Sequence, residues 1–377
     1  MKVIVLGAGL VGGPMAIDLA KEKSFQVTVA DVNAANLEKI KVQGVQKMQK
    51  DLSDPLTVKN LVKDYDMVLN AVPGFMGFQT LKAIIEAKKN AVDIAFFPEN
   101  VLNLDGLAKE NGVTVVSDFG VAPGMSNVLI GYVDHLLDET TNATIYVGGL
   151  PRVREWPYEY KAVFSPVDVI EEYTRPARYV ENGHLITREA LSDPEFHFFP
   201  GVGTLQSFNS DGLRSLAETI KCPNMKEKTL RYPGHIDIMA ILRETGFFSK
   251  DEIEIKGTKI RPLDFTAKLL FPKWKLKEGE EDITVMRVTI EGKKGGKMLR
   301  YDYDLFDTYD PITKTHSMAR TTGYTATVGL RMIAEGIYNR KGVSVPEFVG
   351  QQPECVKYLL KGLAERGIVY KEKIVEI

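Results

Sequence analysis

The residues whose types and spacing most clearly indicate a chemical role are glycines near the start of the chain. Gly7-Ala8-Gly9-Leu10-Val11-Gly12 matches the pattern G-x-G-x-x-G and lies between an apolar run, Lys2 to Leu6, and a segment whose apolar residues have helical spacing. In such a turn the second glycine lets a phosphate approach the backbone, and the third lets the helix pack closely on the strand. N–H groups at the start of the helix then bind a pyrophosphate. A dinucleotide site is therefore predicted at Gly7, Gly9, Leu10, Val11 and Gly12.

Three later strand ends are expected to complete this site, because ligands of open parallel sheets lie across the carboxyl ends of the strands. Asp31 follows Gly12 by 19 residues, where a carboxylate binds both hydroxyls of the adenosine ribose and repels a 2′-phosphate. NAD is therefore expected as the cofactor rather than NADP. Asp51 is predicted at the adenine edge, although a loop carboxylate without a ligand is an equal alternative. Ala71, Val72 and Pro73 are predicted beside the nicotinamide ribose.

The elements that position these residues follow from the alternation of short apolar runs with amphipathic stretches. This alternation predicts an α/β Rossmann fold, a doubly wound parallel sheet with crossover helices, over residues 1–125. Its six strands are predicted at residues 2–6, 25–30, 45–48, 67–72, 91–96 and 113–117. Longer irregular connections then predict a second, α+β domain over residues 126–315.

The last segment, residues 316–377, is predicted to be helical. Val356, Leu359, Leu360 and Leu363 share one helical face, and Gly367 offers a C-terminal stop. A capping-box spacing, Ser344-x-x-Glu347, predicts an earlier helix start.

Composition excludes several classes of partner and site. The chain has 377 residues with 48 Lys plus Arg against 50 Asp plus Glu, and it has no basic block of the kind that binds duplex nucleic acid. Its two cysteines have neither disulfide-framework nor zinc-site spacing, so no metal is expected. There is no leader pattern and no apolar run of about 18 residues. We expect a cytoplasmic protein that binds a small molecule, without a membrane or nucleic-acid partner.

Several further segments resemble the saccharopine dehydrogenase superfamily, and most closely its lysine 6-dehydrogenase branch. Together with the glycine turn they span nearly the whole chain. They are residues 72–78 (VPGFMGF), 98–100 (PEN), 120–127 (GVAPGMSN), 146–151 (YVGGLP), 172–178 (EYTRPAR), 210–215 (SDGLRS), 231–235 (RYPGH) and 317–326 (SMARTTGYTA).

The resemblance carries expectations about architecture and substrate. It implies that the C-terminal helices complete the nucleotide domain, that a mixed-sheet domain binds substrate across a cleft, and that the protein is a homodimer or homotetramer. Saccharopine reductases have an aspartate in a G-L-D-P-G motif and a cysteine before a Gly-Gly pair, and both figure in their active site. Ala122 and Val147 occupy those positions here, which argues against saccharopine as the substrate.

The leading hypothesis is therefore NAD-dependent oxidative deamination of the ε-amino group of L-lysine. The products would be allysine, which cyclises to piperideine-6-carboxylate, ammonia and NADH. Such a reaction needs an anchor for the α-carboxylate, and the planar fork of arginine suits it. Arg175, Arg214 and Arg231 are the candidates, with structural salt bridges as the alternative for each. Asn127 and Asp211 are expected either to orient the α-amino group or to cap helices.

The reaction also needs an acid or base. Asp93 lies in the fifth predicted strand, Glu99 follows it and Asp118 ends the sixth, so all three carboxylates approach the nicotinamide edge. His235 is a fourth catalytic candidate, because histidine ordinarily titrates near neutrality. Each of the four has a structural alternative as a cap or turn residue.

Two other functions are compatible with the same residues. One is a related imine reductase of the saccharopine, carboxynorspermidine or opine type, which joins an amine and a carbonyl with NAD(P)H. The other is a non-catalytic Rossmann protein that senses NAD.

Overall fold

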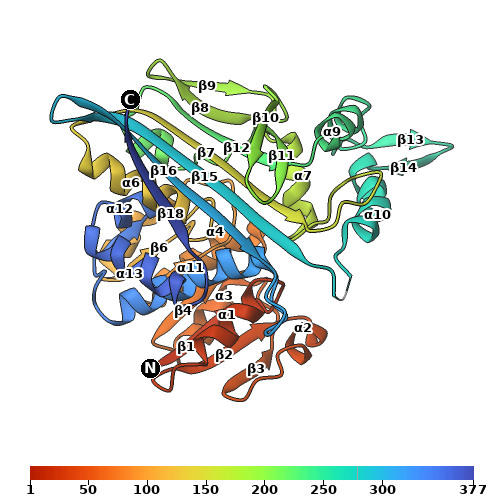
Figure 1. The fold of residues 1–377 in the computed structure, drawn as a ribbon. Coiled ribbons are helices and arrows are strands. Elements are labelled where there is room, and N and C mark those ends of the chain that lie inside the picture. Colours follow the sequence, from red (N-terminus) through yellow and green to blue (C-terminus); the bar gives the residue numbers. More distant parts are fainter. Residues whose placement is uncertain (278) are drawn as a thin grey trace. The chain divides into compact units, whose positions relative to one another are not determined.

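The computed structural model of the protein describes residues 1–277 and 279–377. The chain forms two compact units, both drawn in Figure 1. The first unit contains Met1–Asp138, Glu218–Ile220 and Ala319–Tyr370. The second contains Glu139–Ala217, Lys221–Met318 and Lys371–Ile377.

A parallel sheet of seven strands is the framework of the first unit. Its strand order is β17-β6-β5-β4-β1-β2-β3, in which the chain reverses direction across the sheet beside β1. Reversal of this kind is the hallmark of the Rossmann fold, so the predicted fold class is confirmed. The strands are β1 (Lys2–Leu6), β2 (Gln26–Asp31), β3 (Val45–Gln49), β4 (Met67–Asn70), β5 (Asn90–Asp93), β6 (Thr114–Val116) and β17 (Gly342–Ser344).

Helices cover both faces of this sheet (Figure 1), which explains why β1 and β4 are apolar and buried along almost their whole length. The helices of the first unit are α1 (Gly12–Leu19), α2 (Ala34–Glu38), α3 (Pro55–Val62), α4 (Gly74–Glu86), the 3-10 helix η1 (Val101–Leu104), α5 (Asp105–Glu110), α6 (Met125–Leu136), α12 (Pro346–Gly350) and α13 (Pro353–Ala364). Two more helices, α8 (Leu216–Thr219) and α11 (Ser317–Ala334), cross from one unit to the other along the chain.

The second unit is built on a nine-stranded mixed sheet. The order along its main path is β10-β11-β12-β7-β15-β16-β18, with β8 and β9 attached at β12. Helices α7, α9 and α10 gather at one end of the sheet (Figure 1), where they bury an aromatic cluster that includes Tyr173 and Trp274. The elements are β7 (Glu139–Pro151), α7 (Pro166–Thr174), β8 (Ala177–Glu181), β9 (His184–Arg188), β10 (Glu195–Phe199), β11 (Gly203–Asn209), β12 (Met225–Arg231), α9 (His235–Glu244), the separate hairpin β13 (Ile253–Ile255) and β14 (Thr258–Ile260), α10 (Pro262–Trp274), β15 (Asp282–Lys294), β16 (Lys297–Thr308) and β18 (Tyr370–Glu376).

The unit boundaries differ from those expected at residues 125 and 315. Helix α6 belongs to the first unit, which extends to Asp138. The C-terminal segment from Ala319 to Tyr370 lies in the first unit, which it was expected to complete. The chain then returns to the second unit as β18. Helix α13 and its stop at Gly367, which has φ +79°, agree with the sequence pattern.

The predicted capping box at Ser344 is wrong. Ser344 ends strand β17, and its hydroxyl oxygen accepts hydrogen bonds from Tyr338 (2.7 Å) and Arg340 (2.9 Å). The side chain of Glu347 accepts a hydrogen bond from the hydroxyl of Thr219. Among residues 1–277 and 279–377, no helix has the length and apolar character needed to cross a membrane.

Candidate active site

The glycine turn connects β1 to α1, and each of its glycines meets a different constraint. Gly7 has φ +100°, and a Cβ on it would lie 2.6 Å from the carbonyl oxygen of Ala71. A Cβ on Gly12 would lie 2.1 Å from the carbonyl oxygen of Gly7. Gly9, in contrast, would direct a Cβ into open space. The outer glycines are therefore required by the fold, while the middle one leaves the room that a pyrophosphate needs.

Asp31 is tied to this turn. One carboxylate oxygen accepts the N–H of Ala8 at 2.7 Å, and the other accepts the N–H of Asn33 at the same distance. These bonds fix the carboxylate beside the glycine turn, and each oxygen retains a second lone pair for a ribose hydroxyl. The residues present thus fit a bound dinucleotide.

The other predicted cofactor residues differ in exposure. Leu10 and Pro73 are exposed, Ala71 is half-buried, and Val72 is buried. Asp51 is exposed and accepts the N–H of Ser53 at 2.9 Å, and this bond holds its pKa below the ordinary value. The structure therefore gives Asp51 a role within its own loop, and its contact with adenine stays a prediction.

Polar side chains lie in a row at the carboxyl ends of β4, β5 and β6. Asp93 is fully buried and accepts hydrogen bonds from the Asn70 amide (2.7 Å) and the Ser117 hydroxyl (2.8 Å). Asn70 and Asp93 are register partners on adjacent parallel strands, and Ser117 directly follows the next strand. Sheet register therefore places three residues far apart in sequence at one strand edge.

Burial raises the pKa of Asp93 to about 7, and the negative charge of Asp118 adds to the rise, while the hydrogen bonds from Ser117, Asn70 and the Ala95 N–H oppose it. Asp118 is itself buried and has φ +55°. The structure thus brings two of the predicted carboxylates together. Glu99 is exposed to solvent.

Asn127 lies in the first turn of α6, where it is buried and accepts the hydroxyl of Ser126 at 2.8 Å. The loop before this helix is tightly closed. Gly124 has φ +139°, and a Cβ there would lie 1.9 Å from the carbonyl oxygen of Gly120. Only glycine fits at that position.

Arg231, a predicted substrate anchor, is buried in the aromatic cluster of the second unit. Its Nε donates to the Tyr173 hydroxyl (3.0 Å), Nη2 donates to Glu172 (2.5 Å), and Nη1 donates to the Leu230 carbonyl (2.9 Å). The guanidinium also lies over the Tyr160 ring, 4.6 Å from its centre. The contacts and the burial give Arg231 a structural role in the core of this unit.

His235 continues the same chain of hydrogen bonds. Its Nδ1 lies 2.7 Å from the carbonyl oxygen of Tyr158, so Nδ1 carries the proton, and Nε2 accepts from the Tyr173 hydroxyl at 2.9 Å. Burial, together with the charge of Arg231, lowers the pKa of His235 to about 3. The ordinary pKa that suggested proton transfer near neutrality therefore does not hold for this histidine.

Three predicted residues of the second unit remain. Arg175 follows α7, and its Nη2 lies 3.7 Å from Glu171. Arg214 is buried and has φ +53°. Asp211 accepts both Nε (2.9 Å) and Nη2 (3.2 Å) of Arg178 in a two-pronged pair. Sequence reasoning missed Arg178, although it ends one of the resembling segments.

A buried acid, Glu227, was also missed. It lies in β12 and accepts the Ser210 hydroxyl at 2.6 Å and the N–H of Gly212. Burial raises the pKa of Glu227 to about 8, with further contributions from the negative charges of Glu172 and Asp211. No local pattern marked it, because this strand is buried along almost its whole length rather than on alternate residues. In residues 1–277 and 279–377, no group of three or more His, Cys, Asp or Glu side chains is placed to hold a metal ion.

Most of the chain matches two known family domains. Residues 3–116 match the family described as saccharopine dehydrogenase NADP binding domain, and residues 120–368 match the saccharopine dehydrogenase C-terminal domain. The first unit is thus a pyridine-nucleotide-binding domain.

Individual relatives match over almost the whole chain. Saccharopine dehydrogenase [NADP(+), L-glutamate-forming] from Pyricularia oryzae is 23% identical, with 99% of each chain covered. Carboxyaminopropylagmatine dehydrogenase from Synechocystis sp. is 25% identical, with 99% of this chain and 98% of the relative covered. The solved structure of apo saccharopine dehydrogenase (L-Glu forming) from Saccharomyces cerevisiae has the same fold, with a TM-score of 0.82 at 20% identity and 99% of each chain covered.

The glycine turn has room for a pyrophosphate, both domains match the family, and relatives match over almost the whole chain. The chain therefore belongs to the saccharopine dehydrogenase family of oxidoreductases, which act on carbon–nitrogen bonds.

Proposed function

We propose that the protein oxidises the ε-amino group of L-lysine with NAD and releases ammonia. The observation that carries this proposal is the placement of the carboxylates at the β4–β5–β6 edge. Ala122 stands where saccharopine reductases are expected to have an aspartate, and a buried pair, Asp93 and Asp118, lies at the ends of the neighbouring strands instead. The edge thus keeps acid–base capacity without an aspartate at position 122.

NAD is proposed as the cofactor because of Asp31. A carboxylate held 2.7 Å from the N–H of Ala8 lies where the adenosine ribose of a dinucleotide is bound. Its charge would repel a 2′-phosphate, although the similar saccharopine dehydrogenases are named for NADP. When bound, the nicotinamide supplies the hydride acceptor.

The reaction also has to move protons. A lysine ammonium group loses one proton and then a hydride, which leaves an iminium ion, and water converts this ion to an aldehyde and ammonium. We assign the proton to Asp93, because its burial and the neighbouring negative charge of Asp118 raise its pKa to about 7. Asn70 and Ser117 hold the Asp93 carboxylate in place for this role.

The anchor for the α-carboxylate is assigned to an arginine of the second unit. Because Arg231 is buried and its guanidinium donates to three protein oxygen atoms, we assign it to positioning rather than to substrate contact. Arg175 and Arg214 remain the candidates for the α-carboxylate, and Asp211 with Asn127 for the α-amino group. His235, neutral at physiological pH, is assigned to holding Tyr173.

A second candidate is an imine reductase that joins an amine to a carbonyl compound. It is favoured by the full-length similarity to saccharopine dehydrogenases and to carboxyaminopropylagmatine dehydrogenase. The same strand edge would then protonate the imine nitrogen.

A panel of substrates separates the two candidates. The purified protein is incubated with NAD or NADP and with lysine, ornithine, saccharopine or buffer, while NAD(P)H absorbance is followed. We expect reduction of NAD with lysine and little with saccharopine. Reduction of NADP with saccharopine alone would replace the proposal by the second candidate.

A further inference from the structure

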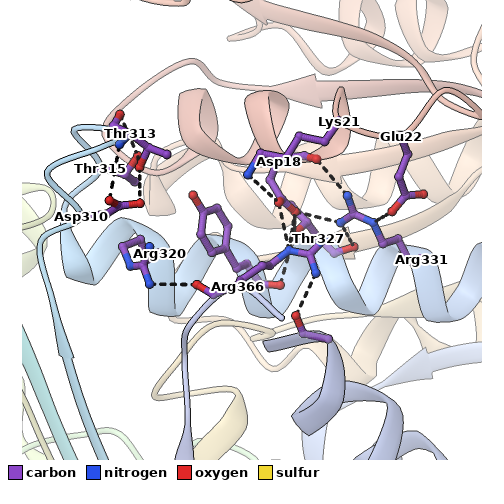
Figure 2. Close-up of polar contacts among 12 residues, drawn as sticks. Asp18, Lys21, Glu22, Asp310, Thr313, Thr315, Arg320, Thr327, Arg331 and Arg366 are labelled. Atoms are coloured by element: carbon purple, nitrogen blue, oxygen red, sulfur yellow. Dashed lines mark hydrogen bonds and ion pairs between the residues drawn. The ribbon is translucent and has the colours of Figure 1, made fainter. Parts of the chain in front are cut away.

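Helix α11 returns to the first unit and runs alongside α1. Several contacts join α11 to the last turn of α1 and to the residues that directly follow it. The Lys21 ammonium lies 5.8 Å from the centre of the Tyr324 ring. Thr327 donates to Asp18 at 2.6 Å, and Arg331 pairs with Asp18 and with Glu22 (Figure 2). Residues about 300 positions apart in sequence are thus joined side by side.

Asp18 is the centre of this contact. Its buried carboxylate accepts hydrogen bonds from Thr327, from Arg331 Nη1 at 2.9 Å and from Arg366 Nε at 2.9 Å, as Figure 2 shows. Burial raises the pKa of Asp18, but the charges of Arg331 and Arg366 outweigh it and hold the pKa below the ordinary value. Arg331 Nη2 also donates to the Asp18 carbonyl oxygen at 2.9 Å. The carboxyl end of α1 is therefore fixed by charge-assisted bonds on both its side chain and its backbone.

The opposite end of α1 meets α11 through a glycine. A Cβ on Gly323 would lie 2.8 Å from Met15 Cγ and 3.2 Å from Val11 Cγ1. Val11 is part of the glycine turn and directly precedes α1. One residue earlier in α11, Thr322 lies 3.0 Å from the Cβ position of Gly120, in the loop after β6. The start of α11 thus packs against the glycine turn and against a loop at the same strand edge.

Helix α1 has eight residues, a length at which packing rather than intrinsic helicity decides its orientation. Binding through backbone N–H groups depends on their direction, and fixing that direction in advance increases affinity. Whatever holds α1 at both ends therefore affects the nucleotide.

We propose that α11 is part of the cofactor-binding machinery, with Gly323 and Arg331 as positioning residues that aim the glycine turn at the pyrophosphate. The proposal rests on the nucleotide site of the first unit and not on the identity of the amine substrate. It assigns a cofactor role to a segment more than 300 residues from the glycine turn that it positions.

The test compares NADH binding by Gly323→Ala, Arg331→Lys and Arg331→Met with the unmodified full chain, using fluorescence titration. Thermal unfolding without nucleotide shows whether each variant is folded. Because small misplacements of binding groups have large effects, we expect the Kd of NADH to rise between about 5-fold and about 100-fold. For variants with turnover, KM for the nucleotide should rise in parallel, while kcat at saturating nucleotide should change less than about 2-fold.

Arg340→Ala is the matched control. Arg340 donates to the Val343 carbonyl (2.8 Å) and to Ser344 (2.9 Å), so it also anchors the C-terminal segment of the first unit, but through β17 rather than α1. This variant should lower the unfolding temperature and leave the Kd of NADH unchanged.

Two results would overturn the proposal. One is a folded Gly323→Ala variant whose Kd for NADH is within about 2-fold of that of the unmodified chain. This result would count whether or not an Arg331 variant is also folded. The other is a control variant that weakens binding as much as the α11 variants do. If the unmodified chain bound neither NADH nor NADPH, the nucleotide site itself would be wrong, whatever the amine substrate.

Discussion

Asn70 and Asp93 lie side by side at the ends of two neighbouring strands, with the amide nitrogen of one 2.7 Å from a carboxylate oxygen of the other. The hydroxyl of Ser117 completes the row from the third strand. Hydrogen bonds to both carboxylate oxygens favour the ionised form, whereas complete burial favours the neutral form and raises the pKa to about 7. The strand edge therefore contains a group that changes protonation near neutrality.

The first prediction concerns this group. Because burial raises the pKa of Asp93 to about 7 and the reaction needs its ionised form, kcat should rise with pH through about 7. Asp93→Asn should remove the inflection and lower kcat by about 100-fold to 10,000-fold, the usual contribution of an acid–base group. Ser117→Ala removes a hydrogen bond from the ionised form, so it should move the inflection to higher pH. A pH–rate profile measures all three, and an unshifted inflection in Asp93→Asn would exclude Asp93 as its origin.

The second prediction concerns the buried acid of β12. The pKa of Glu227 is about 8 in the folded protein, whereas 4.5 is its ordinary value. A raised pKa means that the folded protein keeps a proton that the unfolded chain releases, so this contribution to stability is lost as pH rises from about 4.5 to about 8. The free energy of unfolding of Glu227→Gln, minus that of the unmodified chain, should therefore be larger at pH 8 than at pH 5. Urea unfolding at both pH values measures the free energies, and a difference independent of pH would contradict the assignment.

The third prediction concerns the nucleotide preference. Asp31→Ala should weaken the binding of NAD more than the binding of NADP, because the variant loses both the ribose contacts and the repulsion of a 2′-phosphate. The affinities for the two reduced cofactors are compared by titration. Glu38→Ala removes an exposed carboxylate from α2 and serves as the control. An unchanged ratio of the two affinities in Asp31→Ala would show that Asp31 does not select the cofactor.

The fourth prediction concerns the substrate anchor. Replacing the arginine that binds the α-carboxylate should raise KM for the amine about 10-fold to 100-fold, since hydrogen bonds to charged groups contribute about 1.5–3 kcal/mol each. We expect this for Arg175→Ala or Arg214→Ala, with Arg300→Ala, a surface residue of the mixed sheet, as control. Arg231→Ala should instead destabilise the fold by about 3–5 kcal/mol, because it leaves Glu172 without its partner. If Arg175 and Arg214 both tolerate alanine, the anchor lies elsewhere.

Local sequence signals predicted much of the first unit. The strand Lys2–Leu6 was predicted with its observed bounds, because a run of apolar residues before a glycine turn needs no distant information. Helix α13 was predicted for the same reason, from the spacing of Val356, Leu359 and Leu363. Strand β17 was missed, since three residues contain no periodicity and it forms only by pairing with β6.

Site residues were harder to predict wherever distant contacts decide their chemistry. His235 looked suited to proton transfer, and only its burial beside Arg231 and Tyr173 reveals a pKa of about 3. Glu227 was missed because its proton affinity comes from burial and from acids on other elements. The pairing of Asp18 with Arg331 joins residues 313 positions apart, and no local pattern predicts it.

The most direct test of the central claim is the amount of ammonia released per NADH formed when the protein acts on L-lysine with NAD. Oxidative deamination predicts one ammonia for each NADH, together with an aldehyde that cyclises. Formation of NADH without release of ammonia would contradict the account. Rapid oxidation of saccharopine, with no reaction of lysine, would also contradict it.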